Sequence, residues 1–373
     1  MMTPGPTGMH EDFLNAMAAD VTNPDLDLAF YDKYMDVVDK FKKIIKTTNT
    51  SYILGGEGIL GLEAACCSLI EPGDRVLCIT NGIFGEGFAD FAKMFGGDVV
   101  VYNGNTRTGI DVKKLENFLN NDSDFKLATL VHCETPSGIT NPIKSICKLL
   151  SNKKIVSVVD AVASMGGEHI ETDNWNIDIL LGGSQKCFSA HVGLAPLSIS
   201  DKAMEIIQNR KSPITGYYNN LKVWKNWYED KWFPYTQLIS NVMGFDKALD
   251  RCLEKDFVSI HQKYADAVRY AFVICGFELF PKSHYSNTVT AVNLPDRISF
   301  QTLFDDLKSE GVLIGGGFGF LKDKIFRIGH MGENCSFEKF NILFKAMDKV
   351  FVKNGIQLKS SILKEFNQVF HNA

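Results

Sequence analysis

Two residues with the means to do chemistry, an aspartate and a lysine, follow apolar stretches of the chain. Asp160 ends the run IVSVVD, and Lys186 closes the string GGSQK directly after the run IDILL. Burial of a lysine favours its neutral amine, which can form a Schiff base or act as a base. A buried carboxylate such as Asp160 favours the cationic form of a pyridine ring, which makes that ring an electron sink. Taken singly, Lys186 could be a surface lysine and Asp160 a turn cap, so the inference depends on their combination.

A glycine-rich turn and a late arginine could bind the charged ends of a ligand. The turn LGGEGILGLE at 54–63 leads from a short apolar run into a helix, whose free N–H groups and positive dipole end suit a phosphate. It lacks the lysine of a Walker loop and the full dinucleotide spacing, so a tight turn without a ligand is the alternative. Arg327, in the string FRIG, could bind a carboxylate through two hydrogen bonds, or it could be an ordinary surface charge.

The elements that must position these residues follow a regular rhythm from about residue 52. Strand-like apolar runs alternate with segments of helical periodicity; the runs cover 75–80, 98–102, 126–132, 155–160 and 177–181, and the helical segments 58–70, 84–95 and 143–151. Apolar strands separated by helices predict a parallel sheet covered on both faces. Such sheets bind ligands at the carboxyl ends of their strands, where the glycine-rich turn, Asp160 and Lys186 stand.

The rhythm changes near residue 255 and predicts a second, smaller α+β domain. Its helices are expected at 257–275, 300–310 and from 337, and its strands at 277–280, 288–294 and 324–329. Because Pro4, Gly5 and Pro6 interrupt the start of the chain, the first twenty residues are interpreted as an irregular arm. The predicted division is an arm at 1–20, a large domain at 21–255 and a small domain at 256–373. The last stretch, 355–373, has apolar residues at helical spacing, and we expect this helix to pack on the body of the protein.

Composition excludes several classes of protein. The chain has 373 residues, 45% of them hydrophobic and 22% charged, with a formal net charge of -5, so it shows no basic footprint for a nucleic acid. No apolar run is long enough to cross a membrane, and the N-terminus does not resemble a secretory signal. Nine scattered cysteines without a C-x-x-C pair predict free thiols in a reducing cytosol and no metal site.

The order of these strings resembles a known family, the class V aminotransferases of the alanine–glyoxylate and serine–pyruvate type, which have pyridoxal-phosphate (PLP) fold type I. The matching strings are TPGP (3–6), GLEAA (61–65), EPGD (71–74), NGIFG (81–85), HCETPSG (132–138), VDAVASMGG (159–167), GGSQK (182–186) and FRIGHMG (326–332). The resemblance spans roughly residues 3 to 350. It implies a mostly parallel seven-stranded sheet in the large domain and a smaller α+β C-terminal domain.

The resemblance assigns roles around the cofactor ring and the substrate. It implies that Lys186 holds PLP as a Schiff base, that Asp160 pairs with the pyridine nitrogen and that Phe84 stacks on the ring. Arg327 matches the residue that binds the substrate carboxylate, and Gly5 matches a segment that lines the substrate pocket. Released Lys186 would then move the proton from the substrate Cα to the cofactor carbon.

Other matches concern the phosphate. They are Glu57, Gly58 and Ile59 in the phosphate-binding turn, Ser184 and Gln185 near the phosphate, and Thr236, which implies a homodimer because its counterpart reaches the phosphate of the neighbouring subunit.

Two positions depart from the family pattern. Glu57 replaces a small or hydroxyl residue, and a carboxylate beside a phosphate dianion is unfavourable, so Glu57 must point away or be protonated. Pro136 replaces a serine or threonine, and we expect Thr135, rather than Ser137, to take over its contact with the ring.

The expected function is PLP-dependent transamination, by a ping-pong mechanism, between a small amino acid such as alanine or serine and pyruvate or glyoxylate. A cysteine desulfurase or other β-lyase is the nearest alternative, but such enzymes carry histidines where this chain has Phe84 and Gln185. A phosphonate or phosphoserine aminotransferase would need extra cations, for which Arg210 or Lys211 could serve. Outside enzymes, the alternatives are a catalytically silent binding module of the same fold and a nucleotide-binding protein.

Overall fold

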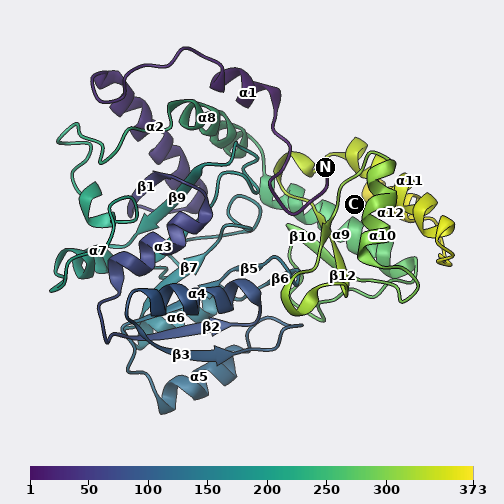
Figure 1. Ribbon diagram of the computed structural model, residues 1–373, viewed down its shortest axis with the longest axis horizontal. Helices are drawn as coiled ribbons and strands as arrows, with labels where there is room; N and C mark the ends of the chain where they lie inside the picture. The colour runs from purple at the N-terminus through teal and green to yellow at the C-terminus, as the bar shows by residue number, and fades with distance from the viewer. Residues whose placement is uncertain (373) are drawn as a thin grey trace.

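The computed structural model describes residues 1–372, and a seven-stranded sheet forms the centre of its larger part (Figure 1). The strand order is β1-β9-β8-β7-β4-β2-β3, and all strands except β9 run in one direction. The strands are β1 (Thr50–Gly55), β2 (Arg75–Thr80), β3 (Asp98–Asn103), β4 (Leu127–Val131), β7 (Val156–Asp160), β8 (Ile179–Leu181) and β9 (Leu194–Ile199). The predicted mostly parallel seven-stranded sheet is therefore confirmed.

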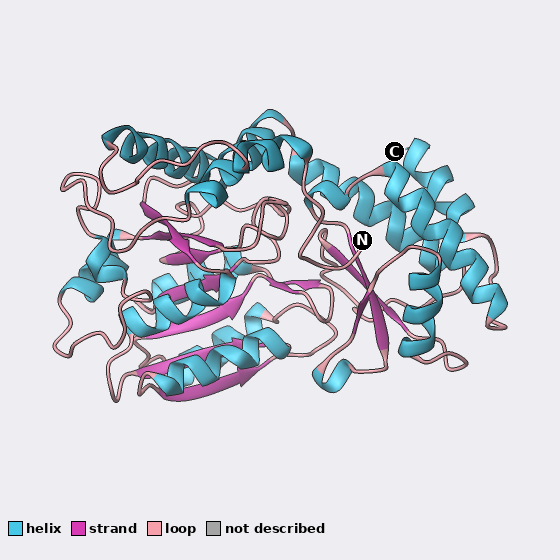
Figure 2. Ribbon diagram, turned by 45° about the horizontal axis from the view of Figure 1, so that its top comes forward, coloured by secondary structure: helices cyan, strands magenta, loops and turns pink. Residues whose placement is uncertain are grey.

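Helices cover this sheet, and every residue of β4, β7, β8 and β9 is buried. Figure 2 shows the helices packed along the strands. The helices of this part are α2 (Leu28–Ile45), α3 (Gly58–Leu69), α4 (Ile83–Met94), α5 (Val112–Asn121), α6 (Ile143–Asn152), α7 (Asp201–Gln208) and α8 (Ile239–Glu254). A short hairpin of β5 (Cys133–Glu134) and β6 (Ile139–Thr140) follows β4 at the carboxyl edge of the sheet.

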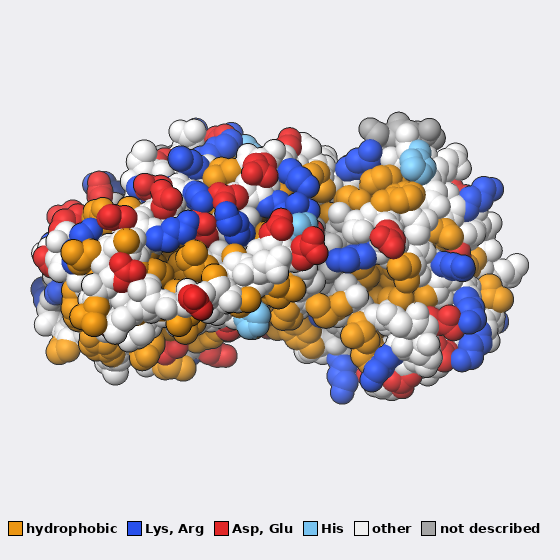
Figure 3. Space-filling view, turned by 90° about the horizontal axis from the view of Figure 1, so that it is seen from above, with side chains coloured by type: hydrophobic (Ala, Val, Ile, Leu, Met, Phe, Trp, Pro, Cys, Tyr) orange, Lys and Arg blue, Asp and Glu red, His pale blue; other side chains and the backbone are white. Residues whose placement is uncertain are grey.

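The second part of the chain builds a three-stranded antiparallel sheet with four helices. The strand order is β10-β12-β11, and the bounds are β10 (Val289–Asn293), β11 (Gly315–Gly316), β12 (Ile325–Gly329), α9 (Phe257–Ile274), α10 (Phe300–Ser309), α11 (Phe337–Lys353) and α12 (Ile362–Asn372). The expected strand at 277–280 is reduced to an isolated bridge between Leu279 and Val292. Figure 3 shows the two parts side by side as two lobes.

The two largest buried clusters of the described chain lie in different parts of the sequence. One cluster draws its residues from Phe13 to Leu249, and the other from Tyr264 to Phe366. Met2 is the exception, because it is buried in the second cluster although it starts the chain. Its N–H donates to the Leu313 carbonyl at 2.7 Å, and its own carbonyl accepts from the Gly329 N–H at 2.8 Å. The first residues of the N-terminal arm are thus fixed to the small domain.

The prediction that residues 1–20 are irregular throughout is wrong, because α1 forms at Glu11–Met17. The Pro and Gly residues that suggested an irregular arm end before this helix. The His10 ring accepts a hydrogen bond from the Asp12 N–H, Glu11 and Asp12 add negative charge to the first turn, and Phe13 is buried. These local features allow the helix to form shortly after the helix-breaking residues Pro4, Gly5 and Pro6.

A stretch without long elements, residues 209–238, is held in place by aromatic packing. Phe233 stacks on Tyr31 of α2 with ring centroids 4.5 Å apart, and Trp227 packs edge-on against Tyr34 at 4.9 Å. Tyr235 lies next to the glycine-rich turn, where its hydroxyl accepts from the Gly55 N–H at 3.3 Å. This packing gives the segment that carries Thr236 a defined position beside β1.

Within the described residues 1–372, no helix is both long enough and apolar enough to cross a membrane. All nine cysteines lie in this part of the chain and carry free thiols, as the sequence predicts.

The C-terminal helix α12 packs on the body of the small domain, as expected; Ala373 lies outside the described residues. Phe366 is fully buried and lies against Phe340 and Phe344 of α11, with ring centroids 5.3 and 5.0 Å apart. Ile362 is buried in the same cluster.

We expect Phe366→Ala to lower the free energy of unfolding by about 3–5 kcal/mol, because it leaves a cavity between α11 and α12. Urea unfolding followed by circular dichroism measures this change. Gln368→Ala, at an exposed position of the same helix, is the control and should change stability by less than about 0.5 kcal/mol. Equal stability of the two variants would contradict the packing assigned to α12.

Candidate functional site

The two chemistry-bearing residues meet at one edge of the large sheet. Asp160 is the last residue of β7 and stands opposite Leu181, the last residue of the parallel neighbour β8. The chain then turns and brings Lys186 back to the same edge. Both line a pocket that leaves about 510 Å³ free of protein atoms, together with Glu57, Gly58, Ile59, Leu62, Phe84, Cys133, Thr135, Val162, Ala163 and Gln185. The pocket therefore brings together eight of the predicted site residues.

The Lys186 amine is buried against the N-terminal arm. It donates to the Pro4 carbonyl at 2.9 Å. Gly5 has a φ of +84°, and a side chain there would come within 2.5 Å of the Lys186 Cδ, so both the backbone and the space require glycine. Burial lowers the pKa of Lys186, and the positive charge of Arg327 lowers it further. This environment favours a neutral, nucleophilic amine.

Asp160 is held by the turn that follows its strand. Its Oδ1 accepts from the Val162 N–H at 2.7 Å. Burial raises the pKa of Asp160 to about 6, against the opposing effects of the Val162 N–H and the Lys186 charge, and the negative charge of Glu57 contributes to the rise. A protonated pyridine nitrogen would give this buried carboxylate the positive partner that the carboxylate needs.

Phe84 lies on the first turn of α4 and faces the pocket with 36% of its surface exposed. Glu134, a buried residue of β5, holds this turn in place. Its two carboxylate oxygens accept from the Phe84 N–H at 2.7 Å and the Gly85 N–H at 3.1 Å. The string HCETPSG contains this residue, but the sequence does not show its role, because its partners lie about fifty positions earlier.

Arg327 approaches this site from the small domain, although it is not one of the residues that line the pocket. It lies on β12, is nearly buried, and its Nε donates to the Gly316 carbonyl at 2.8 Å. Its guanidinium stands 5.1 Å from the centre of the Phe318 ring, which in turn meets the Phe84 ring edge-on at 5.8 Å. Burial lowers the pKa of Arg327 to about 10. The remaining guanidinium nitrogens suit a substrate carboxylate.

The ring end of the pocket fits a pyridoxal group, because an amine, a carboxylate and an open aromatic face converge there. The expected phosphate end does not fit a dianion. Glu57 does not point away: its Oε1 accepts from the Ile59 N–H at 3.0 Å, and its Oε2 accepts from Gln185 at 3.3 Å. The Ser184 hydroxyl is also occupied, because it donates to the His191 carbonyl at 2.6 Å.

Ser184 and Thr236 are the predicted cofactor residues that do not line this pocket. Thr236 is exposed on the segment before α8, one residue after Tyr235. Thr135 is buried and does line the pocket, on the side of Cys133. A role for Thr236 therefore requires a second copy of the chain.

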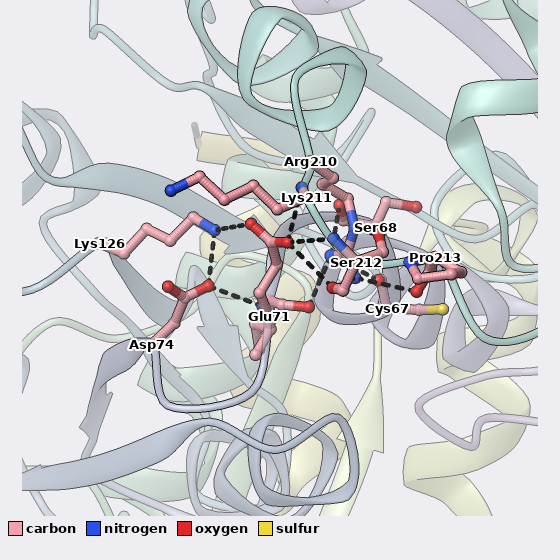
Figure 4. Close-up of polar contacts among 10 residues, drawn as sticks. Cys67, Ser68, Glu71, Asp74, Lys126, Arg210, Lys211, Ser212 and Pro213 are labelled. Carbon is pink, nitrogen blue, oxygen red and sulfur yellow. Dashed lines mark hydrogen bonds and ion pairs between the residues drawn. The ribbon is translucent and has the colours of Figure 1, made fainter.

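Arg210 and Lys211 lie at the other end of α3, away from the pocket (Figure 4). Arg210 donates to the carbonyls of Cys67, Ser68 and Ile70, where it caps the C-terminal end of α3. The Lys211 N–H donates to Glu71 at 2.9 Å. A helix of this length separates them from Glu57 by about 18 Å, so these cations do not supply a second phosphate site at the pocket.

Comparisons with known proteins agree with this geometry. The family described as aminotransferase class V matches residues 9–312. An uncharacterized aminotransferase of Methanocaldococcus jannaschii is 33% identical over 97% of this chain and 94% of its own length. The pyridoxamine–pyruvate transaminase of Mesorhizobium japonicum is 33% identical over 89% of this chain and 86% of its own. The crystal structure of ureidoglycine–glyoxylate aminotransferase from Bacillus subtilis, 27% identical, superposes with a TM-score of 0.96 over 100% of this chain and 97% of that one.

Glu134 gives the site a measurable pH signature. Burial raises its pKa to about 7 from an ordinary value of 4.5, so the folded protein binds this proton more tightly than the unfolded chain. The stability that Glu134 contributes is therefore present below about pH 4.5 and is lost as the pH rises through about 7. Relative to Glu134→Gln, the free energy of unfolding of the unmodified protein should fall by roughly 3 kcal/mol across this range.

Urea unfolding at several pH values between 5 and 8 measures this difference. Glu116→Gln, at an exposed position of α5, is the control and should follow the unmodified protein at every pH. Parallel pH curves for the unmodified protein and Glu134→Gln would show that Glu134 is not the buried proton acceptor assigned here.

Proposed function

The chain belongs to the class V aminotransferase family, and we propose that it transfers an amino group between a small amino donor, alanine or serine, and a 2-oxo acid such as pyruvate or glyoxylate, in a ping-pong reaction. The observation that carries this proposal is the convergence of the Lys186 amine and the Asp160 carboxylate on one pocket, where the Phe84 ring is exposed. The family uses PLP, and a pyridoxal ring supplies an electron sink when it is bound.

Each residue then has a task that its surroundings support. Lys186 would hold the aldehyde carbon of the ring and, as a free amine, would move a proton at the substrate Cα as base and acid. Asp160 would pair with the ring nitrogen and favour its protonated form. Phe84 would pack on the ring, and Arg327 would orient the substrate carboxylate.

The names of the relatives support the choice of acceptor. One relative uses pyruvate and one solved structure is of a glyoxylate enzyme, while their amino donors differ. The donor in the first of these is pyridoxamine, itself a ring of the pyridoxal class. The identity of the 2-oxo acid is therefore better supported than the identity of the amino donor.

A desulfurase or other β-lyase is less favoured, because Phe84 and Gln185 stand where such enzymes carry histidines. A silent binding module is less favoured because a protein without catalysis would not need a buried lysine beside a buried aspartate. A cytosolic location suits nine free thiols.

A homodimer with shared sites is part of the proposal. Thr236 is exposed beside the glycine-rich turn, and large apolar side chains near that turn are also exposed: Ile59 by 45%, Tyr218 by 57% and Leu238 by 43%. Tyr218 stacks on Tyr235 with ring centroids 4.3 Å apart. Exposed apolar surface of this kind favours an interface between proteins.

Light scattering should give twice the mass of one chain. Leu238→Glu should shift the mass towards that of a monomer, because a charge would be buried at the interface. Val352→Glu, at an exposed position of α11, should leave the mass unchanged. A monomer at all protein concentrations would contradict the shared site.

Substitutions at Lys186 and Asp160 test the chemistry. Borohydride reduction in the presence of pyridoxal compounds should label Lys186, and Lys186→Ala should lose both the label and the activity. Asp160→Asn should keep the label but lose at least about a hundredfold in turnover, since the ring nitrogen loses its charged partner.

Lys211→Ala, at an exposed lysine far from the pocket, is the matched control and should retain label and turnover. The assay follows keto-acid formation from alanine and serine, with sulfide release from cysteine measured in parallel. Label at another lysine, or sulfide as the main product, would contradict the proposal.

A further inference from the structure

We propose that the pocket takes the pyridoxal ring without its phosphate, so that a non-phosphorylated vitamer binds as an exchangeable substrate. This proposal rests on the function proposed for Lys186 and Asp160. It starts from Glu57, which stands in the turn where the family binds phosphate and whose carboxylate faces the same pocket.

Glu57 already occupies the positive end of α3. It is the N-cap of that helix, and its Oε1 accepts from the Ile59 N–H at 3.0 Å. A phosphate at this place would need the same N–H group. There is no free space next to Gly58, because even a Cβ atom added there would lie within 2.6 Å of the Val162 side chain. The side chain of the protein thus replaces the anion that this turn would otherwise bind.

The other polar groups at this end do not offer donors to a dianion. The Ser184 hydroxyl donates to the His191 carbonyl and accepts from the Leu194 N–H at 3.3 Å. The Gln185 amide nitrogen donates to Glu57. The Gln185 Oε1 is buried and has no hydrogen-bond partner among the described residues, and the side chain is only 5% exposed. An unpaired acceptor next to a carboxylate suits a ligand hydroxyl, which can donate, and disfavours a phosphate dianion, which cannot.

The charges of the residues that line the pocket also disfavour a phosphate dianion. Of the twelve residues that line the pocket, two are acidic, Glu57 and Asp160, and one is basic, Lys186. Thr236 would add a hydroxyl from a second copy of the chain but no positive charge. A dianion beside the Glu57 carboxylate would therefore be repelled in a partly buried site where water screens poorly. The uncharged hydroxymethyl group of pyridoxal or pyridoxamine avoids this repulsion.

The reaction balances without any further reagent. Pyridoxamine and a 2-oxo acid give pyridoxal and an amino acid: the C–N bond of the aminomethyl group breaks and a C–N bond at C2 of the acid forms. The aminomethyl carbon is oxidised by two electrons to the aldehyde, and C2 is reduced by two. One water is released as the oxo acid condenses with the amine, and one is consumed as the aldehyde forms. Lys186 moves the proton, and a ring without a phosphate anchor can leave after each turnover.

The test compares vitamers with and without phosphate on the full-length protein. Pyridoxal and PLP are titrated separately, trapped at Lys186 with borohydride and distinguished by the mass of the adduct. Pyridoxamine and its phosphate are then compared as amino donors to pyruvate. For the unmodified protein we expect at least about a tenfold preference for the non-phosphorylated donor, and lower half-saturation by pyridoxal than by PLP.

Two substitutions identify Glu57 as the cause. Glu57→Thr keeps a helix cap and removes the charge, and it should raise the affinity for PLP by at least about tenfold. Glu57→Gln keeps the size and removes the charge, and it should raise that affinity in the same direction. A preference of the unmodified protein for PLP, or unchanged PLP affinity in both variants, would overturn this inference while Lys186 labelling still supported the proposed function. If neither vitamer labels Lys186, the proposed function itself fails.

Discussion

The structure of the site depends on one constraint, the burial of a lysine and an aspartate at the same edge of a parallel sheet. Burial disfavours both charges, so it lowers the pKa of Lys186 and raises that of Asp160 to about 6. The in-register pairing of β7 with β8 fixes where Asp160 ends, and the turn after β8 returns Lys186 to that edge. The other groups at the site contact this pair or lie beside it: Pro4 accepts from the Lys186 amine, Phe84 lines the same pocket, and the positive charge of Arg327 lowers the pKa of Lys186 further.

Two carboxylates at helix N-termini also contribute to the structure of the site. Glu57 caps α3 with its own side chain, while Glu134 reaches α4 from a neighbouring hairpin. Both use the positive end of a helix to compensate a carboxylate beside the pocket. The two differ in effect, since Glu134 positions an aromatic ring and Glu57 sets the charge of the cavity.

The sequence allowed most of the parallel strands and three of the large-domain helices, α3, α4 and α6, to be predicted, because apolar runs and helical periodicity determine them locally. The β2 bounds agree residue for residue, and the α3 and α4 bounds agree to within one residue at each end. Strand β9 was not predicted, because Pro196 lies within it and proline is unusual in a central strand. The strand nevertheless forms between β1 and β8, where the Pro196 carbonyl accepts from the Gly182 N–H. The orientation of Glu57 could not be predicted either, because it depends on Gln185, which lies 128 positions away.

The N-terminal arm links the two lobes at the reactive group itself. Met2 is hydrogen-bonded to the small domain, and two residues later the Pro4 carbonyl accepts from the amine of Lys186 in the large domain. With so short a span of backbone between the two attachments, any hinge motion that separates the lobes must lengthen or break the bond to the amine. A change in the distance between the lobes would therefore change the contact between Pro4 and the Lys186 amine, through the first four residues of the chain.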